Sequence, residues 1–140
     1  MSKKVLKQGP IHPDKIAESI SNHSSKTAIG AHNIFLGQVR ADKHKQKQVK
    51  GITYSAYEEM AEQVFHEIRE NIFEKYDISC MHIYHSLGMV KAGEISLFVF
   101  VSSKHRGVSY EASRDVVEQI KAKAPIWKKE IFENKEHHWV

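Results

Sequence analysis

The segment ISLFVFVSS, residues 95–103, is the most apolar run of the chain and decides the fold. β-Branched and aromatic residues fill it, and these residue types favour strands. The apolar residues follow one another without the polar alternation of a half-exposed strand, so we expect burial on both faces. The run is far too short to span a lipid bilayer. It therefore predicts the central strand of a covered sheet.

The residues just before this strand predict its hairpin partner. Residues 77–88, DISCMHIYHSLG, alternate roughly with a period of two. The glycines of GMVKAGE, residues 88–94, are typical of the turn that follows. His82 and His85 lie three positions apart on the predicted strand, so their side chains are expected on opposite faces.

Helical spacing of apolar residues predicts three helices. The clearest covers 57–76, where charges surround one apolar stripe: Met60, Val64, Phe65, Ile68 and Ile72. A short helix over 12–20 begins near Pro13. The third begins near Ser109 and ends at Pro125, because proline lacks an amide hydrogen and disfavours helix in the residue before it.

The remaining segments complete a mixed pattern. Strands are predicted at 27–39, 51–57 and 126–132, and the basic stretch 40–50 predicts an exposed loop. The order α-β-β-α-β-β-α-β has no regular βαβ repeat, which favours an α+β fold. With 140 residues and 41% hydrophobic content, we expect one domain covering 1–140.

Composition restricts the classes of function. Lys and Arg number 21 against 17 Asp and Glu, and the resulting charge of +4 favours small anions and acidic partners as much as nucleic acid. Cys80 is the only cysteine, which excludes an internal disulfide and a zinc site with paired thiolates. The ten histidines are scattered, so neither a metal nor a cofactor is expected. The N-terminus lacks the apolar core of a signal peptide, which predicts a cytoplasmic protein.

Residues 102–113, SSKHRGVSYEAS, place cations where the central strand leads into the third helix. Backbone amides and the helix dipole favour an anion at such a junction, and Lys104, His105 and Arg106 add charge there. Two interpretations stay open. One is a phosphate site; the other is an ordinary helix start with solvated cations and a serine cap from Ser102, Ser103 or Ser109.

Residues 120–130, IKAKAPIWKKE, gather lysines around a short apolar group. Lys121 lies near the helix end, and Lys128 follows Pro125, which redirects the chain so that the two lysines can converge. Lysines that are close together and partly desolvated have lowered pKa values, and a partly neutral amine can act as base or nucleophile. Trp127, with the isoleucine before it, is expected to anchor the turn. The alternative is that these lysines extend into solvent from an ordinary helix end.

Three segments together resemble the large, catalytic subunit of molybdopterin synthase: FLGQVR (35–40), SSKHRGVSYEAS (102–113) and IKAKAPIWKKE (120–130). Two more follow the order and approximate spacing of that family: YSAYEEMAE (54–62) and HSLGMVKAGE (85–94). The resemblance extends over most of the chain, from residue 27 to residue 133. Its most specific part is the segment with Pro125, Trp127 and the lysines.

This resemblance implies a fold and a reaction. The fold would be an α/β hammerhead with an added antiparallel β subdomain. The enzyme would be a sulfurtransferase of molybdenum cofactor biosynthesis that converts cyclic pyranopterin monophosphate, precursor Z, into the dithiolene of molybdopterin. The sulfur would come from the thiocarboxylated C-terminal Gly-Gly of a small ubiquitin-like subunit. Two large subunits would form a homodimer within a heterotetramer.

The resemblance also implies which residues form the site. Lys121 and Lys128 would be catalytic, giving acid/base help and stabilising the anionic intermediate formed as sulfur enters. The substrate-binding residues would be Gln38, Val39, Arg40, His105, Arg106, Lys129 and Glu130. A cation cluster of this kind would offset two anions, the substrate phosphate and the incoming thiocarboxylate.

From the residues alone, two other classes of function stay open. A nucleic-acid-binding module would use the 40–50 segment and the cations of 102–113, although the chain shows no aromatic stacking surface flanked by basic residues. A structural adaptor would leave the lysine cluster without a role.

Overall fold

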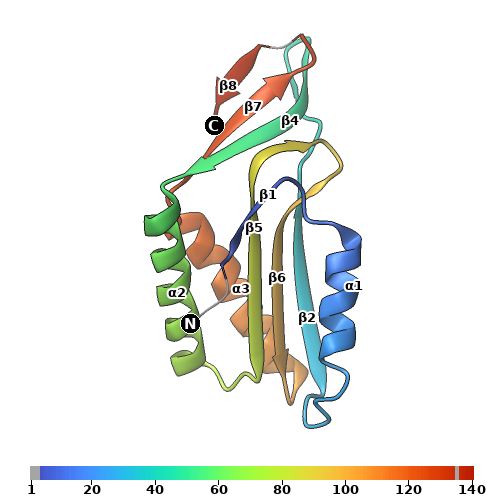
Figure 1. Cartoon of the computed structure of the whole chain (residues 1–140), viewed down its shortest axis with the longest axis vertical. Coiled ribbons are helices and arrows are strands. Elements are labelled where there is room, and N and C mark those ends of the chain that lie inside the picture. Colours follow the sequence, from blue (N-terminus) through green and yellow to red (C-terminus); the bar gives the residue numbers. More distant parts are fainter. Residues whose placement is uncertain (1–3, 135) are drawn as a thin grey trace.

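The computed structural model describes residues 4–134 and 136–140 and has the predicted α+β architecture (Figure 1). In chain order the elements are β1 (Leu6–Gln8), α1 (Pro13–Asn22), β2 (Ala31–Gln38), β3 (Lys43–His44), β4 (Lys47–Ala56), α2 (Glu58–Lys75), β5 (Cys80–Lys91), β6 (Ile95–Ser103), α3 (Arg106–Lys123), β7 (Ile126–Phe132) and β8 (His137–Trp139). The hairpin β5–β6, the three helices and the strand β7 match the sequence prediction. β1, β3 and β8 were not predicted.

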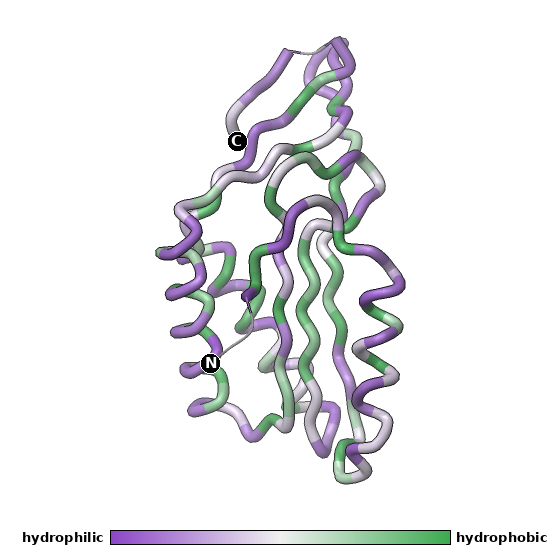
Figure 2. Tube along the Cα trace, in the orientation of Figure 1, coloured by the Kyte–Doolittle hydropathy of each residue, from purple (hydrophilic) through white to green (hydrophobic). Residues whose placement is uncertain are grey.

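Strand β6 is buried on both faces, as its sequence predicts. Leu97, Val99 and Val101 join the main core beneath α2 and α3. The alternate residues Phe98 and Phe100 face the other way and pack with residues of α1 and β2. Figure 2 shows the hydrophobic residues concentrated along the central strands and the helices hydrophilic on their outer sides. Helices therefore cover both faces of this part of the sheet.

The sheet has two parts that share β5. Its strand order is β2-β6-β5-β4-β7-β8, and β1 adds to β5 in parallel. Residues Cys80–His85 of β5 pair with β6, whereas Gly88–Lys91 pair with β4. The strands β4, β7 and β8 form the antiparallel part at the top of Figure 1. Gly88, with a φ of 79°, stands where β5 changes partners, and this backbone conformation favours glycine.

The buried stripe of helix α2 agrees with the predicted one at Phe65, Ile68 and Ile72 but begins at Ala61 and not at Met60. The buried residues are Ala61, Phe65, Ile68 and Ile72, at spacings of four, three and four. Met60 was wrongly predicted to lie on this stripe: it is 57% exposed. Met60 directly precedes Ala61, and the smaller residue occupies the buried position.

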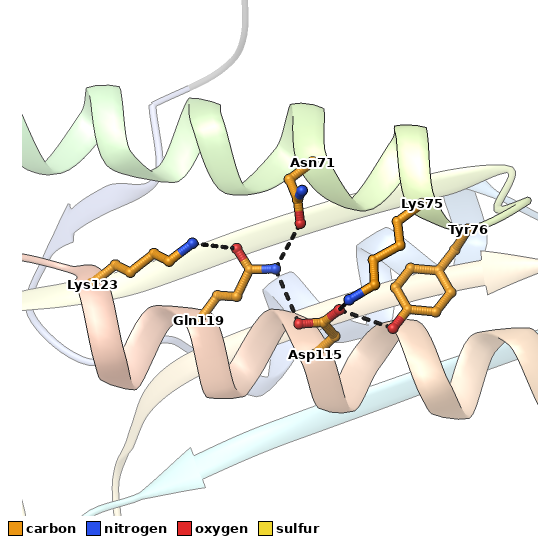
Figure 3. Close-up of polar contacts among 6 residues, drawn as sticks. All are labelled: Asn71, Lys75, Tyr76, Asp115, Gln119 and Lys123. Atoms are coloured by element: carbon orange, nitrogen blue, oxygen red, sulfur yellow. Dashed lines mark hydrogen bonds and ion pairs between the residues drawn. The ribbon is translucent and has the colours of Figure 1, made fainter.

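Polar side chains join α2 to α3 along their exposed edge (Figure 3). Lys75 and Tyr76 both contact Oδ2 of Asp115, each at 2.8 Å. Gln119 donates to Asn71 and to Asp115. This network fixes the two helices against each other, so that the last turn of α3 is held at the base of the antiparallel part.

Two further predictions need correction. The stretch 40–50 is not simply a loop, because β3 and the start of β4 form a small antiparallel hairpin within it. Trp127 does not form a buried anchor: the residue is 44% exposed, and its ring meets that of Tyr57 edge-on, with ring centroids 4.9 Å apart. No helix in the described ranges is long and apolar enough to cross a membrane.

Candidate active site

A cavity of about 490 Å³ opens where the two parts of the sheet meet. This volume is in the range of sites for small molecules. Residues from β2, β4, β5, β6, α3 and β7 line it, and they include Gln38, Val39, Arg40, Lys121, Lys128 and Glu130. Six of the nine predicted site residues therefore share one pocket.

Helix α3 and strand β7 bring the two predicted catalytic lysines together. Ile120, 3% exposed, packs into the main core and fixes the last turn of α3, so the neighbouring Lys121 reaches the cavity. The chain leaves the helix at Ala124, whose backbone is extended, as expected for the residue before Pro125. Strand β7 then pairs Lys128 with Tyr54 of β4. Convergence across the proline is thus confirmed.

The pocket lowers the pKa of Lys128 to about 8. Burial is the largest cause, because a desolvated amine favours its uncharged form, and the positive charge of Lys121 acts in the same direction. Both carboxylate side chains that line the cavity are paired with residues other than the two lysines. Glu130 pairs with His44 at 3.1 Å, and Asp42 pairs with Arg40 at 3.4 Å. A fraction of Lys128 is therefore uncharged near neutral pH.

The end of β2 lines the pocket as predicted, but its residues do so differently. Val39 is buried and held by backbone hydrogen bonds to Glu94 and Gly93. Gln38 is exposed at the cavity wall. The Arg40 side chain pairs with Asp42 but is 81% exposed, so the guanidinium still has donors that face an anion entering from solvent.

His105 and Arg106 lie at the opposite end of α3 from the lysine pair. Arg106 begins the helix, and Lys121 is 15 residues further on, which at about 1.5 Å per residue is about 22 Å along the axis. One chain therefore does not bring these predicted residues to the same small molecule. The serine cap of the alternative interpretation is absent: His105 is the N-cap, and Ser103 and Ser109 donate to backbone carbonyls.

Lys129 faces away from the cavity, because successive residues of a strand point to opposite faces. Its amine lies over the Trp139 ring, 5.2 Å from the centroid. Lys128 and Glu130, on either side of it in the chain, both line the pocket. A period of two across the KKE motif already separates Lys129 from its neighbours. The substrate-binding role of Lys129 stays a prediction.

Four polar pocket residues were not predicted from the sequence: Asp42, Tyr54, His85 and Ser96. Tyr54 donates its hydroxyl hydrogen to Ser96 Oγ at 2.9 Å, and burial raises the pKa of Tyr54. His85 meets the Tyr54 ring edge-on, with centroids 5.2 Å apart. The period of two along residues 77–88 indicates the face of the strand on which His85 lies, but no local pattern marks these residues as members of a pocket.

Within 4–134 and 136–140, no group of three or more His, Cys, Asp or Glu side chains is arranged to hold a metal ion. The opposite orientation predicted for the two β5 histidines is confirmed. His85 lines the pocket, whereas His82 lies near His23 after α1, with their Nε2 atoms 3.2 Å apart.

Comparison with known proteins identifies the family of this fold and pocket. The model of the MoaE protein family matches residues 6–123. The chain belongs to the MoaE protein family. The matched range includes the end of β2, the buried His85 and Lys121, all of which line the cavity.

Individual relatives agree with this assignment. The chain is 37% identical to the molybdopterin synthase catalytic subunit of Bacillus subtilis, over 94% of this chain and 80% of that protein. It is 36% identical to the protein of the same name from Aspergillus fumigatus, over 84% of this chain but only 62% of that longer protein. The crystal structure of molybdopterin synthase from Staphylococcus aureus superposes with a TM-score of 0.85 at 31% identity, covering 100% of this chain and 98% of that one.

Proposed function

We propose that this chain is the catalytic subunit of a molybdopterin synthase. It transfers sulfur from the thiocarboxylated C-terminus of a small ubiquitin-like subunit to precursor Z, forming the molybdopterin dithiolene. The observation that carries this proposal is the convergence of Lys121 and Lys128 in one cavity whose carboxylate side chains pair with Arg40 and His44 and not with the lysines. We also infer that the protein acts in the cytoplasm.

The charges in the cavity suit the two reactants. A thiocarboxylate and a pterin phosphate are both anions, and two cations held in a partly desolvated pocket attract them more strongly than solvated lysines would. Arg40 adds a third cation at the exposed rim. We assign the phosphate to the Arg40 side and the thiocarboxylate to the lysine pair.

The lysines have complementary roles in this proposal. For each sulfur, a C–S bond forms on a side-chain carbon of the pterin as a C–O bond of that carbon breaks, and its oxygen leaves as water or with the phosphate. The acyl C–S bond then breaks by hydrolysis to leave the partner's carboxylate. Lys121 stabilises the anion that develops as sulfur enters. Lys128, with its pKa near 8, exchanges a proton with the reacting groups at neutral pH.

We propose that His105 and Arg106 bind substrate in the pocket of a second copy of the chain. Their distance from Lys121 along α3 requires this if they contact precursor Z at all. A surface for self-association is present: Phe35 and Leu36 are exposed on the edge strand β2, and Tyr110 is exposed on α3. Phe35 and Tyr110 also line a second cavity, of about 290 Å³, between these elements.

The central test is dithiolene formation from precursor Z by the purified chain and a thiocarboxylated small subunit. Lys121→Gln and Lys128→Gln each remove one cation, and we expect each to lower the rate about 100-fold or more. Lys123→Gln is the matched control, since Lys123 lies on the same helix, is exposed and contacts Gln119. An inactive wild type, or a fully active Lys121→Gln, would contradict the proposal.

Mixed dimers test the shared site. Lys121→Gln and Arg106→Gln chains are each inactive alone in this proposal, but a mixed dimer has one pocket with both intact residues. After subunit exchange we expect about a quarter of wild-type activity to return, because half the dimers are mixed and half their pockets are intact. If mass spectrometry shows that the subunits have exchanged and no activity returns, Arg106 does not contribute to the pocket of the second chain.

A further inference from the structure

His85 is a buried polar group at the lysine pocket for which the proposed sulfur transfer has so far given no role. It lies on β5, is 5% exposed and lines the cavity. The Tyr54 ring meets it edge-on on one side, and Phe65 of α2 lies behind it with ring centroids 6.4 Å apart. These contacts fix the plane of the imidazole.

One hydrogen bond fixes which nitrogen of His85 carries the hydrogen. Nδ1 lies 2.8 Å from the carbonyl oxygen of Ser86. A carbonyl oxygen only accepts, so Nδ1 must donate, and in the neutral ring Nε2 then carries the lone pair. The nitrogen left for the cavity is an acceptor.

The charged groups acting on His85 are the two lysines. The pKa of His85 is lowered to about 4, mainly by burial and to a smaller extent by the positive charges of Lys121 and Lys128, against the raising effect of the Ser86 hydrogen bond. Lys121 has the larger effect of the two. At neutral pH the ring is therefore an uncharged acceptor beside two amines that can only donate when charged.

We propose that His85 is a positioning residue for the active site, and that its Nε2 accepts a hydrogen bond from the amine of Lys121. This inference rests on the proposed function. A hydrogen bond of this kind orients the amine towards the cavity and keeps it from turning to solvent. A neutral acceptor does so without the strong attraction for the amine's proton that a carboxylate exerts.

Three substitutions separate the two nitrogens of the ring. His85→Gln places an amide oxygen near the position of Nε2, so it keeps an acceptor for Lys121. His85→Asn places its amide near Nδ1, so it keeps the donor to Ser86 but leaves nothing for Lys121. His85→Phe keeps only the ring volume. The three variants thus distinguish packing from acceptor chemistry.

Each variant is assayed as the full chain with the thiocarboxylated small subunit and precursor Z. We expect kcat to fall about 10- to 100-fold in His85→Asn and His85→Phe, with KM little changed, and to stay within about threefold of wild type in His85→Gln. Equal losses in all three would overturn the acceptor role, as would no loss in any. An inactive wild type would instead reject the proposed function, so the two failures are distinguishable.

A measurement on the wild-type chain avoids any folding defect of these variants. In ¹⁵N spectra of the imidazole at neutral pH, we expect Nδ1 to carry the hydrogen and Nε2 to show the shift of a hydrogen-bond acceptor. In Lys121→Met, the Nε2 signal should move to the position of an unprotonated nitrogen without a donor, whereas Lys123→Met should leave it unchanged. An Nε2 signal that is the same in both variants would overturn the proposal.

Discussion

Two lysines in different regions show how the surroundings of an amine decide its chemistry. Lys75, at the end of α2, lies 2.8 Å from Asp115, and this carboxylate raises the pKa of Lys75 mainly through their hydrogen bond (Figure 3). Lys128, on β7, is partly buried beside Lys121, and its pKa falls to about 8. The first amine stays charged and joins two helices. The second changes its charge near neutral pH, which is a requirement for proton transfer.

The two regions also differ in what they contribute to the folded state. The network around Asp115 satisfies its donors and acceptors, whereas the pocket holds like charges together with a buried neutral histidine. Charge burial without a partner lowers stability and is retained where function needs it. Substitutions that pair or remove an unpaired charge in the pocket should therefore raise stability and lower activity.

The largest expected effect on stability is the acid sensitivity due to His85. Its pKa is about 4 in the folded chain, against an unperturbed value of 6.5. The unfolded chain therefore binds a proton as the pH falls below 6.5 while the folded chain does not, and stability is lost until about pH 4. We expect this to amount to about 3 kcal/mol of the free energy of unfolding.

Urea titrations of wild type and His85→Gln between pH 7 and pH 4 measure this loss. The wild type should lose about 3 kcal/mol more than the variant, because other titrating groups are common to both. His66→Gln is a control for an exposed histidine, since His66 lies on the solvent side of α2 near Glu70. Parallel pH dependences in wild type and His85→Gln would show that His85 titrates normally.

Gln38→Glu gives the pocket the kind of partner that Lys75 already has. Gln38 lines the cavity and is exposed, so a carboxylate there is tolerated by the fold. It should raise the pKa of Lys128 and repel the anionic substrate and thiocarboxylate. We expect dithiolene formation at pH 7.5 to fall at least about tenfold, and Gln38→Met, which adds no charge, to cost much less. Equal losses of activity in Gln38→Glu and Gln38→Met would show that the shape of the side chain at this position, not its charge, causes the effect.

Lys128→Met should stabilise the chain while abolishing its activity. Below pH 8 the amine is charged in both states, and the folded state bears the cost of its burial. Between pH 8 and 10.5 the folded amine loses its proton first, so the cost disappears.

We expect a gain of about 1 kcal/mol at pH 7 after allowing for solvent screening of this half-exposed group. The gain should vanish above pH 10.5. Lys129→Met, on the other face of β7, is the control in the same urea titrations. A gain in Lys129→Met as large as in Lys128→Met would point to charge in general, not to the pocket.

Asp115→Asn is the mildest change and removes the partner of Lys75. The pKa of Lys75 should return towards the ordinary lysine value of 10.5, and Tm should fall by no more than a few degrees, because exposed ion pairs contribute little. Dithiolene formation should be unchanged. A marked loss of activity would mean that the α2–α3 network positions Lys121, and the two regions would not be independent.

The sequence predicted the fold wherever the pattern of apolar residues was strong. The run at 95–103, the hairpin before it and the long helix α2 follow directly from strand and helix periods. The short strands β1, β3 and β8 were beyond such patterns, because two or three residues carry no period and their pairing depends on distant partners. Met60 was wrongly placed on the buried stripe of α2 because it is hydrophobic, whereas the buried position belongs to the next residue, the smaller Ala61.

The candidate site was predicted unevenly for a similar reason. Pro125 made the convergence of Lys121 and Lys128 foreseeable from local chemistry. The separation of Lys121 from Arg106 along one helix was foreseeable too, from the rise per residue, but a family resemblance groups residues without their distances. The place of His85 in the pocket depends on the pairing of β5 with β6, where His85 lies opposite Leu97, and no local pattern records that pairing.

The most direct test of the lysine pocket is a ¹³C titration of the side-chain Cε signals in the wild-type chain. Signals are assigned with Lys128→Met and Lys75→Met. We predict a midpoint near pH 8 for Lys128 and one above 10.5 for Lys75. Midpoints for both lysines at about 10.5 would contradict the claim that this pocket holds an amine poised for proton transfer.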